Sequence, residues 1–542
     1  MSKYFLGIDV GTGSARAALV DSAGKIIAVS VAEIKTFQSV EGHLEQSSDN
    51  IFDQITFCVK DVIKKCSNPN LIHGIGVCAT CSLVAIDQNG EPVSVSLCGK
   101  EDQNVILWMD HRAKKEAAII NRTGHEILKF VGGQVSLEME MPKVLWMKRN
   151  LGENFKRVQH FFDLPDFITW KLTGKGTRSI CSLVCKWNYD GINLKWCEDF
   201  LQTIGLEELT LNNFDRLGNE IQNPGEPIQG GLSEEIAKIF GLRPGIAVAS
   251  SMIDAHCGAL GVLGCQLNEK NDSNSINSKL AIIAGTSSCH MSITQMPLYV
   301  DGIWGPYYSV ILPGYCHEAG QSASGVLLDF IIESHPAYST LKNNFLTRVE
   351  IVKHLNELII QMQVEQGFDT YHELTKDIHV YPDYHGNRSP LANPDLRGMI
   401  CGLTLESDER NLAKIYLAAI QGLAYNTKHI IDQLYAAGRE KFTEVLICGG
   451  LSKNHVYVQT HADVLGMPIG LPCTSEPVLL GGAILGAYAC KTWSSLEEAS
   501  RKLCGKAQEI LPDIKSFAFH EKKYKVFHKM LECQLEIQRI MN

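Results

Sequence analysis

The sequence predicts an α/β protein made of two sizeable domains, and three observations lead to this expectation. Its 542 residues are more than a single hydrophobic core usually serves. Apolar runs that fit β-strands alternate with segments whose apolar residues repeat at helical spacing. A pattern of strand, glycine turn and strand occurs at residues 4–21 and again at residues 280–293. The two halves are therefore expected to be built alike.

The first half is expected to begin with an antiparallel meander. Its apolar runs predict strands at residues 4–8, 16–21, 26–30, 74–79, 83–87 and 106–109, and helices around residues 114–120 and 144–148. Tight turns at residues 11–13 and 22–25 join the first three strands, which therefore start a sheet. Ser48 is expected to cap the first helix, because apolar residues from Ile51 to Ile63 follow it at helical spacing.

A polar segment from Gln266 to Ser278 divides the chain. It has almost no apolar side chains and is rich in Asn and Ser, which is typical of a boundary between domains. We therefore expect an N-terminal domain at residues 1–268 and a C-terminal domain at residues 279–542. The second domain is predicted to contain a long helix at 408–434, a strand at 444–448, a turn at 449–454, a Gly-rich helix near 481–488 and a closing helix at 521–541.

Composition and charge exclude several classes of protein. The net charge of -10 opposes a general nucleic-acid surface, which needs clustered Lys and Arg. The Cys78–Cys81 pair lacks the second pair or nearby histidines that a zinc site needs. The most apolar stretch, residues 246–263, contains Asp254 and His256, which a membrane span tolerates poorly. The N-terminus has no basic leader ahead of an apolar core, so we expect a cytoplasmic protein with reduced cysteines. We expect no membrane partner, and a homodimer remains one of the alternatives.

The turn after the first strand has the residues of a phosphate-binding loop. Its glycines let a phosphate approach the backbone, while amide, hydroxyl and guanidinium groups can donate to the phosphate oxygens. The turn consists of Gly11, Thr12, Gly13 and Ser14, with Arg16 just beyond it. Asp9, at the end of the strand, can hold magnesium through water. An ordinary hairpin with a polar tip is the alternative, and the second turn of Gly285, Thr286 and Ser287 argues against it.

Asp254 is the candidate for acid–base chemistry. It stands where an apolar strand meets a helix rich in Gly and Ala, so its carboxylate can face a cleft. There it could accept the proton of a substrate hydroxyl or interact with a metal ion. The alternative is a helix N-cap, a common role for Asp. His256, two residues on, is interpreted as a structural histidine with satisfied hydrogen bonds rather than as a catalyst.

Several motifs together resemble the FGGY carbohydrate kinases, and their order covers nearly the whole chain. They are Gly7-Ile-Asp-Val-Gly-Thr-Gly-Ser-Ala-Arg16, Trp108-Met-Asp-His-Arg112, Asp163-Leu-Pro-Asp-Phe-Ile-Thr-Trp-Lys-Leu-Thr-Gly174, Asp254-Ala-His-Cys-Gly258, Gly285-Thr-Ser287 and Gly449-Gly-Leu-Ser-Lys-Asn454. This family belongs to the actin-like ATPases, so the resemblance implies two ribonuclease-H-like domains that face a central cleft for nucleotide and sugar. One departure is Glu140, which stands in a family signature where Pro, Ser or Thr is usual.

The resemblance also implies roles for particular residues. Asp9 and the turn after it would serve Mg²⁺ and the phosphates of ATP, together with Gly285 and Thr286 of the other domain, while Asp254 matches the catalytic base. Gly449, Gly450 and Asn454 match the loop beside the adenosine, and Glu476, Gly481 and Gly482 match the nucleotide wall that follows it. Simple turn chemistry is the alternative for the glycines and for Asn454.

The sugar is expected on the first domain, at a site built from polar side chains. The candidates are Cys81, Ser82, Asp110, Lys186, Asp254, Glu318 and Gln321, which can donate to or accept from the hydroxyl and carbonyl groups of a ketose. Residues 80–84 are similar to the signature of the D-ribulokinase branch. We therefore expect phosphorylation of the terminal hydroxyl of D-ribulose. Ribitol, L-ribulose or D-xylulose as acceptor, and an actin- or chaperone-like ATPase switch, are the alternatives.

Overall fold

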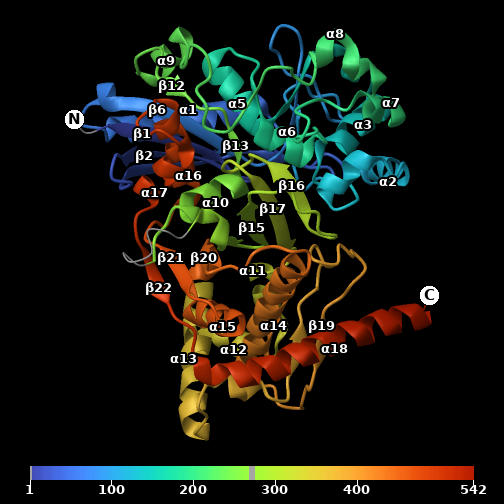
Figure 1. Ribbon diagram of the computed structural model, residues 1–542, viewed down its shortest axis with the longest axis vertical. Helices are drawn as coiled ribbons and strands as arrows, with labels where there is room; N and C mark the ends of the chain where they lie inside the picture. Colours follow the sequence, from blue (N-terminus) through green and yellow to red (C-terminus); the bar gives the residue numbers. More distant parts are fainter. Residues whose placement is uncertain (1–2, 268–274, 542) are drawn as a thin grey trace.

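The computed structural model describes residues 3–267 and 275–541, which form two lobes stacked along the long axis of the molecule (Figure 1). Each lobe is built on a mixed β-sheet with helices packed against it. The strand order is β12-β6-β1-β2-β3 in the first sheet, with β13 also paired to β6, and β16-β17-β15-β14-β20-β21-β22 in the second. The α/β class with two sheets agrees with the prediction. Most of the polar boundary segment, residues 268–274, lies outside the described residues.

The first sheet begins with the predicted meander. Its strands are β1 (Tyr4–Val10), β2 (Ser14–Asp21), β3 (Ile26–Glu33), β6 (Ile72–Ala79), β12 (Ala247–Val248) and β13 (Met252–Ile253). β1 is antiparallel to β2 and parallel to β6. Leu6 and Ile8 point into a core shared with helices α1 (Ser48–Lys64) and α5 (Leu164–Thr173), while Phe5 belongs to the core on the other face. This alternation follows from the two-residue period of a strand.

The second sheet repeats this connectivity. Its strands are β14 (Lys279–Ala284), β15 (Ser288–Thr294), β16 (Trp304–Tyr308), β17 (Tyr315–Gln321), β20 (Glu444–Cys448), β21 (Ile469–Pro472) and β22 (Ala507–Ile510). β14, β15 and β17 are antiparallel neighbours, with β16 added on the outer edge beside β17, and β14 is parallel to β20, as β1 is to β6. The expected likeness of the two halves is confirmed.

Smaller elements complete the lobes. The first lobe carries a sheet of β4 (Thr36–Phe37), β5 (Glu45–Gln46), β7 (Leu83–Ile86), β8 (Val105–Ile106) and β9 (His160–Asp163), with helices α2 (Lys114–Arg122), α3 (Glu140–Asn150) and α6 (Ile180–Lys186). The second carries helices α11 (Gly325–Ser334), α13 (Arg348–Gln366), α14 (Glu409–Ala436), α15 (His455–Leu465) and α18 (Phe517–Met541). Among the described residues, no helix has the length and apolar character needed to cross a membrane.

Two local predictions were wrong in detail. The cap of α1 is Ser47 rather than Ser48, because Ser47 has extended dihedral angles and its side chain accepts from the Asn50 amide, while Ser48 lies in the first turn. The strand predicted at residues 106–109 ends at Ile106. Beyond it the Trp108 amide donates to the Ser82 hydroxyl, so the chain turns away from the sheet.

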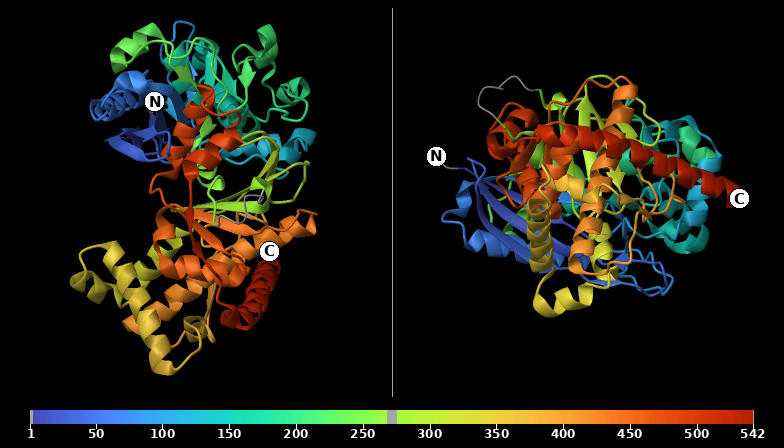
Figure 2. Two further views of the ribbon diagram at one scale, coloured as in Figure 1. Left: turned by 60° about the vertical axis from the view of Figure 1, so that its left-hand side comes forward. Right: turned by 90° about the horizontal axis from the view of Figure 1, so that it is seen from below.

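A helix from the second half of the sequence packs on the first sheet. Helix α16 (Pro477–Ala489) lies against β1 and β6 and against helix α10 (Asp254–Leu263), as Figures 1 and 2 show. The approach is so close that a Cβ atom on Gly76 would lie 1.9 Å from the carbonyl oxygen of Gly482. One on Gly481 would lie 2.0 Å from that of Cys257. These glycines are therefore needed for backbone-to-backbone packing between the sheet and the two helices.

Candidate active site between the lobes

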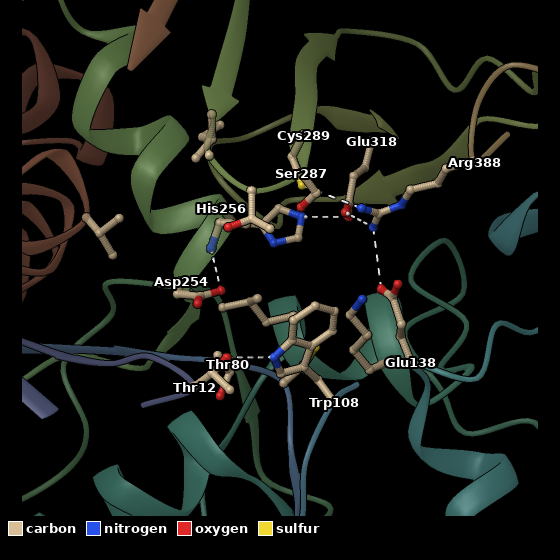
Figure 3. Close-up of a pocket in the computed structure, with 18 residues that line it drawn as sticks. Thr12, Thr80, Trp108, Glu138, Asp254, His256, Ser287, Cys289, Glu318 and Arg388 are labelled. Carbon is tan, nitrogen blue, oxygen red and sulfur yellow. Dashed lines mark hydrogen bonds and ion pairs between the residues drawn. The ribbon is translucent and has the colours of Figure 1, made fainter. Parts of the chain in front are cut away.

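A cavity of about 310 Å³ lies between the two lobes, and both halves of the chain line it. The lining residues are Thr12, Thr80, Cys81, Trp108, Glu138, Lys186, Ile253, Asp254, Ala255, His256, Ile283, Gly285, Thr286, Ser287, Cys289, Glu318, Arg388 and Val478. Figure 3 shows Thr12 and Asp254 on one side of this space and Glu138 and Arg388 on the other. Of the predicted site residues, the fold thus brings together Thr12, Cys81, Lys186, Asp254, Glu318 and residues 285–287.

Two glycine turns from the two sheets face the cavity. The turn between β1 and β2 is closed by a bond from the Gly11 amide to the Ser14 carbonyl, 3.0 Å long. The turn between β14 and β15 is closed by a bond of 2.8 Å from the Gly285 amide to the Ser287 carbonyl. Thr12 is fixed by Trp108, whose indole nitrogen donates to its hydroxyl at 3.0 Å. Because Gly13 and Thr286 are exposed, both turn tips are open to a ligand.

Asp9 sits behind the first turn in an ion pair with Arg16. The Arg16 guanidinium donates twice to Asp9 Oδ2 and reaches Glu476 Oε2 at 3.0 Å, so it bridges the two halves of the chain. Burial raises the pKa of Asp9, and the neighbouring Arg16 opposes this shift. Asp9 Oδ1 lies 3.7 Å from the Cys78 sulfur. Arg16, predicted to contact phosphate, thus already binds two carboxylates in this structure.

Asp254 begins α10 at the wall of the cavity. Its Oδ1 accepts from the Ala255 amide at 2.7 Å, and the N-cap position is occupied by Ile253, so the N-cap alternative does not apply. Burial raises the pKa of Asp254 from its ordinary value of 3.8 to about 6, and the negative charge of Asp9 adds to this shift. The carboxylate is half-buried and therefore accessible from the cavity.

The far end of the cavity holds two cations and two carboxylates around one aromatic ring. Arg388 reaches Glu318 Oε1 at 3.2 Å and Glu138 Oε2 at 3.5 Å. Lys186 Nζ and Arg388 Cζ lie 4.9 and 4.5 Å from the centre of the Trp304 ring. Burial disfavours the charge of Lys186, but Cys81, Glu318 and Glu138 together raise its pKa. This end of the cavity can therefore bind a ligand that has both donors and acceptors.

Sequence reasoning missed Glu138, Arg388 and Trp304 and misjudged His256. Arg388 stands in a Gly-Asn-Arg-Ser-Pro turn at residues 386–390, a composition that looks like an ordinary loop. His256 lines the cavity and its Nε2 lies 3.5 Å from Glu318 Oε2. Its Nδ1 has no hydrogen-bond partner in the described part of the chain. His256 Nε2 also lies 3.8 Å from the Cys185 sulfur, so the expectation of a satisfied histidine holds for one ring nitrogen and fails for the other.

Three predicted sugar ligands do not line the cavity, because other groups already bind them. Both carboxylate oxygens of Asp110 bind the Arg112 guanidinium, and Asp110 is fully buried. Ser82 accepts from the Trp108 amide at 3.2 Å. Gln321 donates to the Leu423 carbonyl at 2.7 Å. These residues hold the walls of the cavity in place and do not face its interior.

The residues predicted beside the adenosine lie outside the cavity as well. Gly449 has φ of 94° and directly follows β20, where a Cβ atom would meet the Ala284 carbonyl oxygen at 2.4 Å. Gly450 next to it is exposed. Asn454 is the N-cap of α15, where its Oδ1 accepts from the backbone amide of Val456. The same oxygen accepts from the side chain of Asn356, and the side-chain Nδ2 of Asn454 donates to the Tyr416 hydroxyl. All three therefore have roles in turn geometry and capping.

Two like halves that enclose a carboxylate and two glycine turns have the architecture of the actin-like ATPases, and a carboxylate beside two such turns suits phosphoryl transfer. Two family models match the chain: the N-terminal domain of the FGGY family of carbohydrate kinases over residues 4–261, and the C-terminal domain of that family over residues 280–490. The chain therefore belongs to the FGGY family and is an ATP-dependent sugar kinase.

Known proteins resemble the chain over nearly its full length. A human FGGY carbohydrate kinase domain-containing protein is 44% identical over 100% of this chain and 98% of its own length. A D-ribulokinase of Saccharomyces cerevisiae is 37% identical over 92% of this chain and 73% of its own. The crystal structure of a xylulose kinase from Rhodospirillum rubrum superposes with a TM-score of 0.78 at 16% identity, and covers 99% of both chains. At that identity, the structural likeness establishes the fold alone.

Proposed function

We propose that this kinase transfers the γ-phosphoryl group of ATP to the terminal hydroxyl of D-ribulose, giving D-ribulose 5-phosphate. The observation that carries the proposal is the place of Asp254: it shares one cavity with both glycine turns and with the charged groups around Trp304. The turns supply donors for phosphate oxygens, and the charged end supplies partners for a polyhydroxy ketone. Asp254 lies where the acceptor hydroxyl would meet the phosphoryl group.

Asp254 would act as the general base. With a pKa of about 6 it is mostly ionised at neutral pH, yet it is basic enough to accept a proton from the attacking hydroxyl. The bond from the Ala255 amide holds Oδ1, so the carboxylate keeps a fixed orientation. Because phosphoryl transfer depends mainly on positioning and charge, this fixed orientation matters as much as the pKa.

Asp9 and Asp254 are the residues that would hold Mg²⁺. Both are carboxylates, the ligands that this ion prefers, and the charge of Asp9 already disfavours ionisation of Asp254. Bound there, the ion would supply positive charge to the phosphates. Asp9 Oδ1, unlike Oδ2, is not engaged by Arg16 and, among the described residues, accepts only from the Cys78 thiol at 3.7 Å; because Asp9 is fully buried, it would act on the ion through a water rather than by direct contact.

The far end of the cavity would select the sugar and help to exclude water. Lys186 can donate to the ketose carbonyl or to a hydroxyl, and Glu318 can accept from a neighbouring hydroxyl. Glu138 from the first lobe and Arg388 from the second form an ion pair across the cavity at 3.5 Å. This pair would tighten as the lobes close, and closure keeps water from competing with the sugar as nucleophile.

The preference for D-ribulose is supported by the name of the S. cerevisiae relative and by the ketose-compatible donors. The test is a coupled ADP assay of the purified protein with D-ribulose, L-ribulose, D-xylulose and ribitol. We expect D-ribulose to give the highest kcat/KM and the Asp254→Asn variant to give almost no sugar-dependent ADP. A higher kcat/KM with another sugar would overturn the choice of substrate. ATP hydrolysis that no sugar stimulates would instead favour a nucleotide-driven switch.

A further inference from the structure

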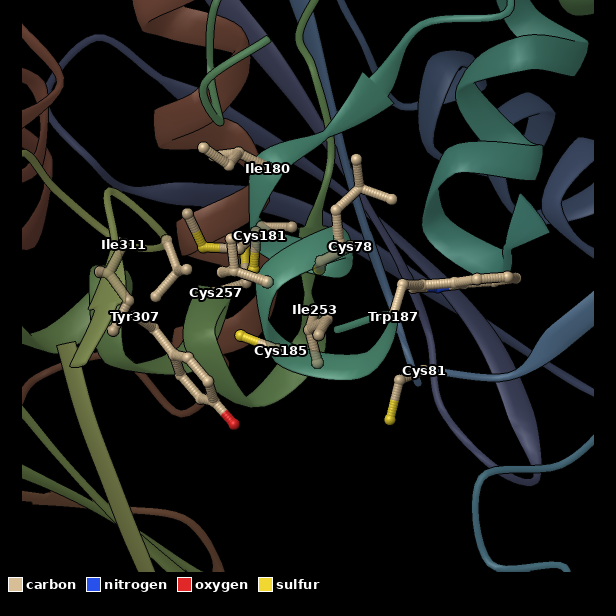
Figure 4. Close-up of a cluster of buried hydrophobic side chains, with 14 of the residues drawn as sticks. Cys78, Cys81, Ile180, Cys181, Cys185, Trp187, Ile253, Cys257, Tyr307 and Ile311 are labelled. Atoms are coloured by element: carbon tan, nitrogen blue, oxygen red, sulfur yellow. The ribbon is translucent and has the colours of Figure 1, made fainter. Parts of the chain in front are cut away.

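Behind the sugar end of the cavity, two thiols and an imidazole converge. Cys181, Cys185 and His256 each offer a ligand atom, these atoms all lie within 4.8 Å of one another, and all three residues are buried. Figure 4 shows Cys181 and Cys185 on one helix, facing the neighbouring helix that carries Cys257. The mechanism proposed above uses neither thiol. A buried set of two sulfurs and one nitrogen is the donor set that soft and borderline metal ions prefer.

The local structure explains why these side chains meet. Cys181 and Cys185 are four residues apart on α6, so both project from the same face of the helix. His256 lies in the first turn of α10, and its Nε2 is 3.8 Å from Cys185 Sγ. In a tetrahedral zinc site the bond lengths place a sulfur and a nitrogen ligand about 3.6 Å apart. The observed separation is therefore close to that of a metal site.

Glu318 lies beside this set, next to His256, although its oxygens are not within 4.8 Å of all three ligand atoms. Its Oε2 lies 3.5 Å from His256 Nε2 and receives no hydrogen bond from residues 3–267 or 275–541. Arg388 binds the other oxygen, Oε1, at 3.2 Å. Glu318 is 4% exposed, so among the residues that the structure describes Oε2 is a buried acceptor without a donor. An ion bound by the three other side chains would satisfy it.

We propose that Cys181, Cys185 and His256 bind one Zn²⁺ ion, that the ion draws in Glu318 as its fourth ligand, and that its binding inhibits the kinase. His256 and Glu318 line the cavity, which gives the ion a path to the thiols. Binding releases the two thiol protons to solvent, leaving two thiolates, a neutral imidazole and a carboxylate around the ion. Mg²⁺ does not compete, because it prefers oxygen ligands and octahedral geometry.

The inhibition rests on the proposed function, because it requires Glu318 to contact the sugar. A bound ion would turn Glu318 Oε2 toward the metal and away from the cavity. It would also fix the end of α6, where Lys186 directly follows Cys185. Both sugar-binding groups would then be held away from the positions that a ketose needs.

Co²⁺ titration of the full-length protein tests metal binding without any reference to activity. We expect one equivalent to produce the intense thiolate-to-Co²⁺ charge-transfer absorption and Zn²⁺ to abolish it by displacement. Cys181→Ser and Cys185→Ser should weaken binding more than about tenfold, since each removes one ligand. The control is Cys197→Ser, which removes the thiol of a second, partly exposed group with His125 and Asp199 and should leave the absorption unchanged.

Kinetic assays then separate the two parts of the proposal. With Mg·ATP fixed, Zn²⁺ should raise the KM for the sugar at least tenfold in the parent and in Cys197→Ser, but not in Cys181→Ser. Absence of the charge-transfer band in the parent protein, or its persistence at full strength in either Cys181→Ser or Cys185→Ser, would overturn the site; one variant that folds is therefore enough for the test. A band without inhibition would overturn the inhibitory role. If the protein has no sugar kinase activity at all, the proposed function fails while the absorption still reports on the site.

Discussion

Replacing Asp254 with Asn tests the assigned base most directly. Asn keeps the size of the side chain and can still accept from the Ala255 amide, but it cannot take up a proton. Loss of a general base lowers turnover by about 10²–10⁴-fold. We expect this loss in kcat at saturating D-ribulose and ATP. Turnover near that of the parent, in a variant that folds normally, would refute the role.

The same substitution is expected to increase the stability of the fold, although it removes most of the turnover. A pKa raised above 3.8 means that the folded state binds the proton more tightly, so the ionised carboxylate destabilises the fold above about pH 6 and does so less as the pH falls toward 3.8. The difference between 3.8 and about 6 corresponds to about 3 kcal/mol, and partial solvent access to the side chain reduces the expected gain to about 1–2 kcal/mol. Thermal unfolding without metal or nucleotide should show a more stable Asp254→Asn variant at pH 7.5 and a smaller difference at pH 5. Equal or lower stability at pH 7.5 would contradict the assigned environment.

Three further outcomes are expected. The kcat/KM of the parent should fall as the pH drops below about 6, because Asp254 becomes protonated there; a profile that stays flat from pH 7.5 to 5 would contradict this. Arg388→Ala leaves the Glu318 carboxylate buried without its cation, which lowers the free energy of unfolding by about 1–3 kcal/mol. The substitution should also raise the KM for the sugar more than it lowers kcat. An unchanged KM in steady-state kinetics would argue against a role in substrate binding. Gly76→Ala should lower the free energy of unfolding by about 1–3 kcal/mol, because the added Cβ would lie 1.9 Å from a carbonyl oxygen of α16. Gly152→Ala is the control, because a Cβ atom added there would have no neighbouring atom within 4 Å. Denaturant titrations of the two variants measure the difference.

Much of the fold could be predicted because it depends on local periodicity. The meander from β1 to β3, the strand β20 (Glu444–Cys448) and the long helix α14 were all predicted within a few residues. Strand and helix patterns repeat over short spans, so a single sequence displays them. Errors arose where one residue decides an end, as with Ser47 and Ser48, since either hydroxyl could cap the helix and only the backbone angles distinguish them.

The candidate site was predictable only where a motif carries the chemistry within a few residues. Asp254 and Thr12 stand at strand ends, and both line the cavity. Asp110 has the same sequence character, yet Arg112 two residues away takes up its carboxylate. Glu138 and Arg388 are 250 residues apart and meet only in the folded chain. Pairings between distant side chains depend on tertiary packing, which motif spacing does not encode.

The position of α16 has a consequence for how the chain is made. One face of β1 and β6 is covered mainly by residues 477–489, so that face lacks this cover until those residues have left the ribosome. Domains usually fold in the order of synthesis. Here the strands that are synthesised first are covered only after most strands of the second sheet have been made, and they are available to chaperones until then.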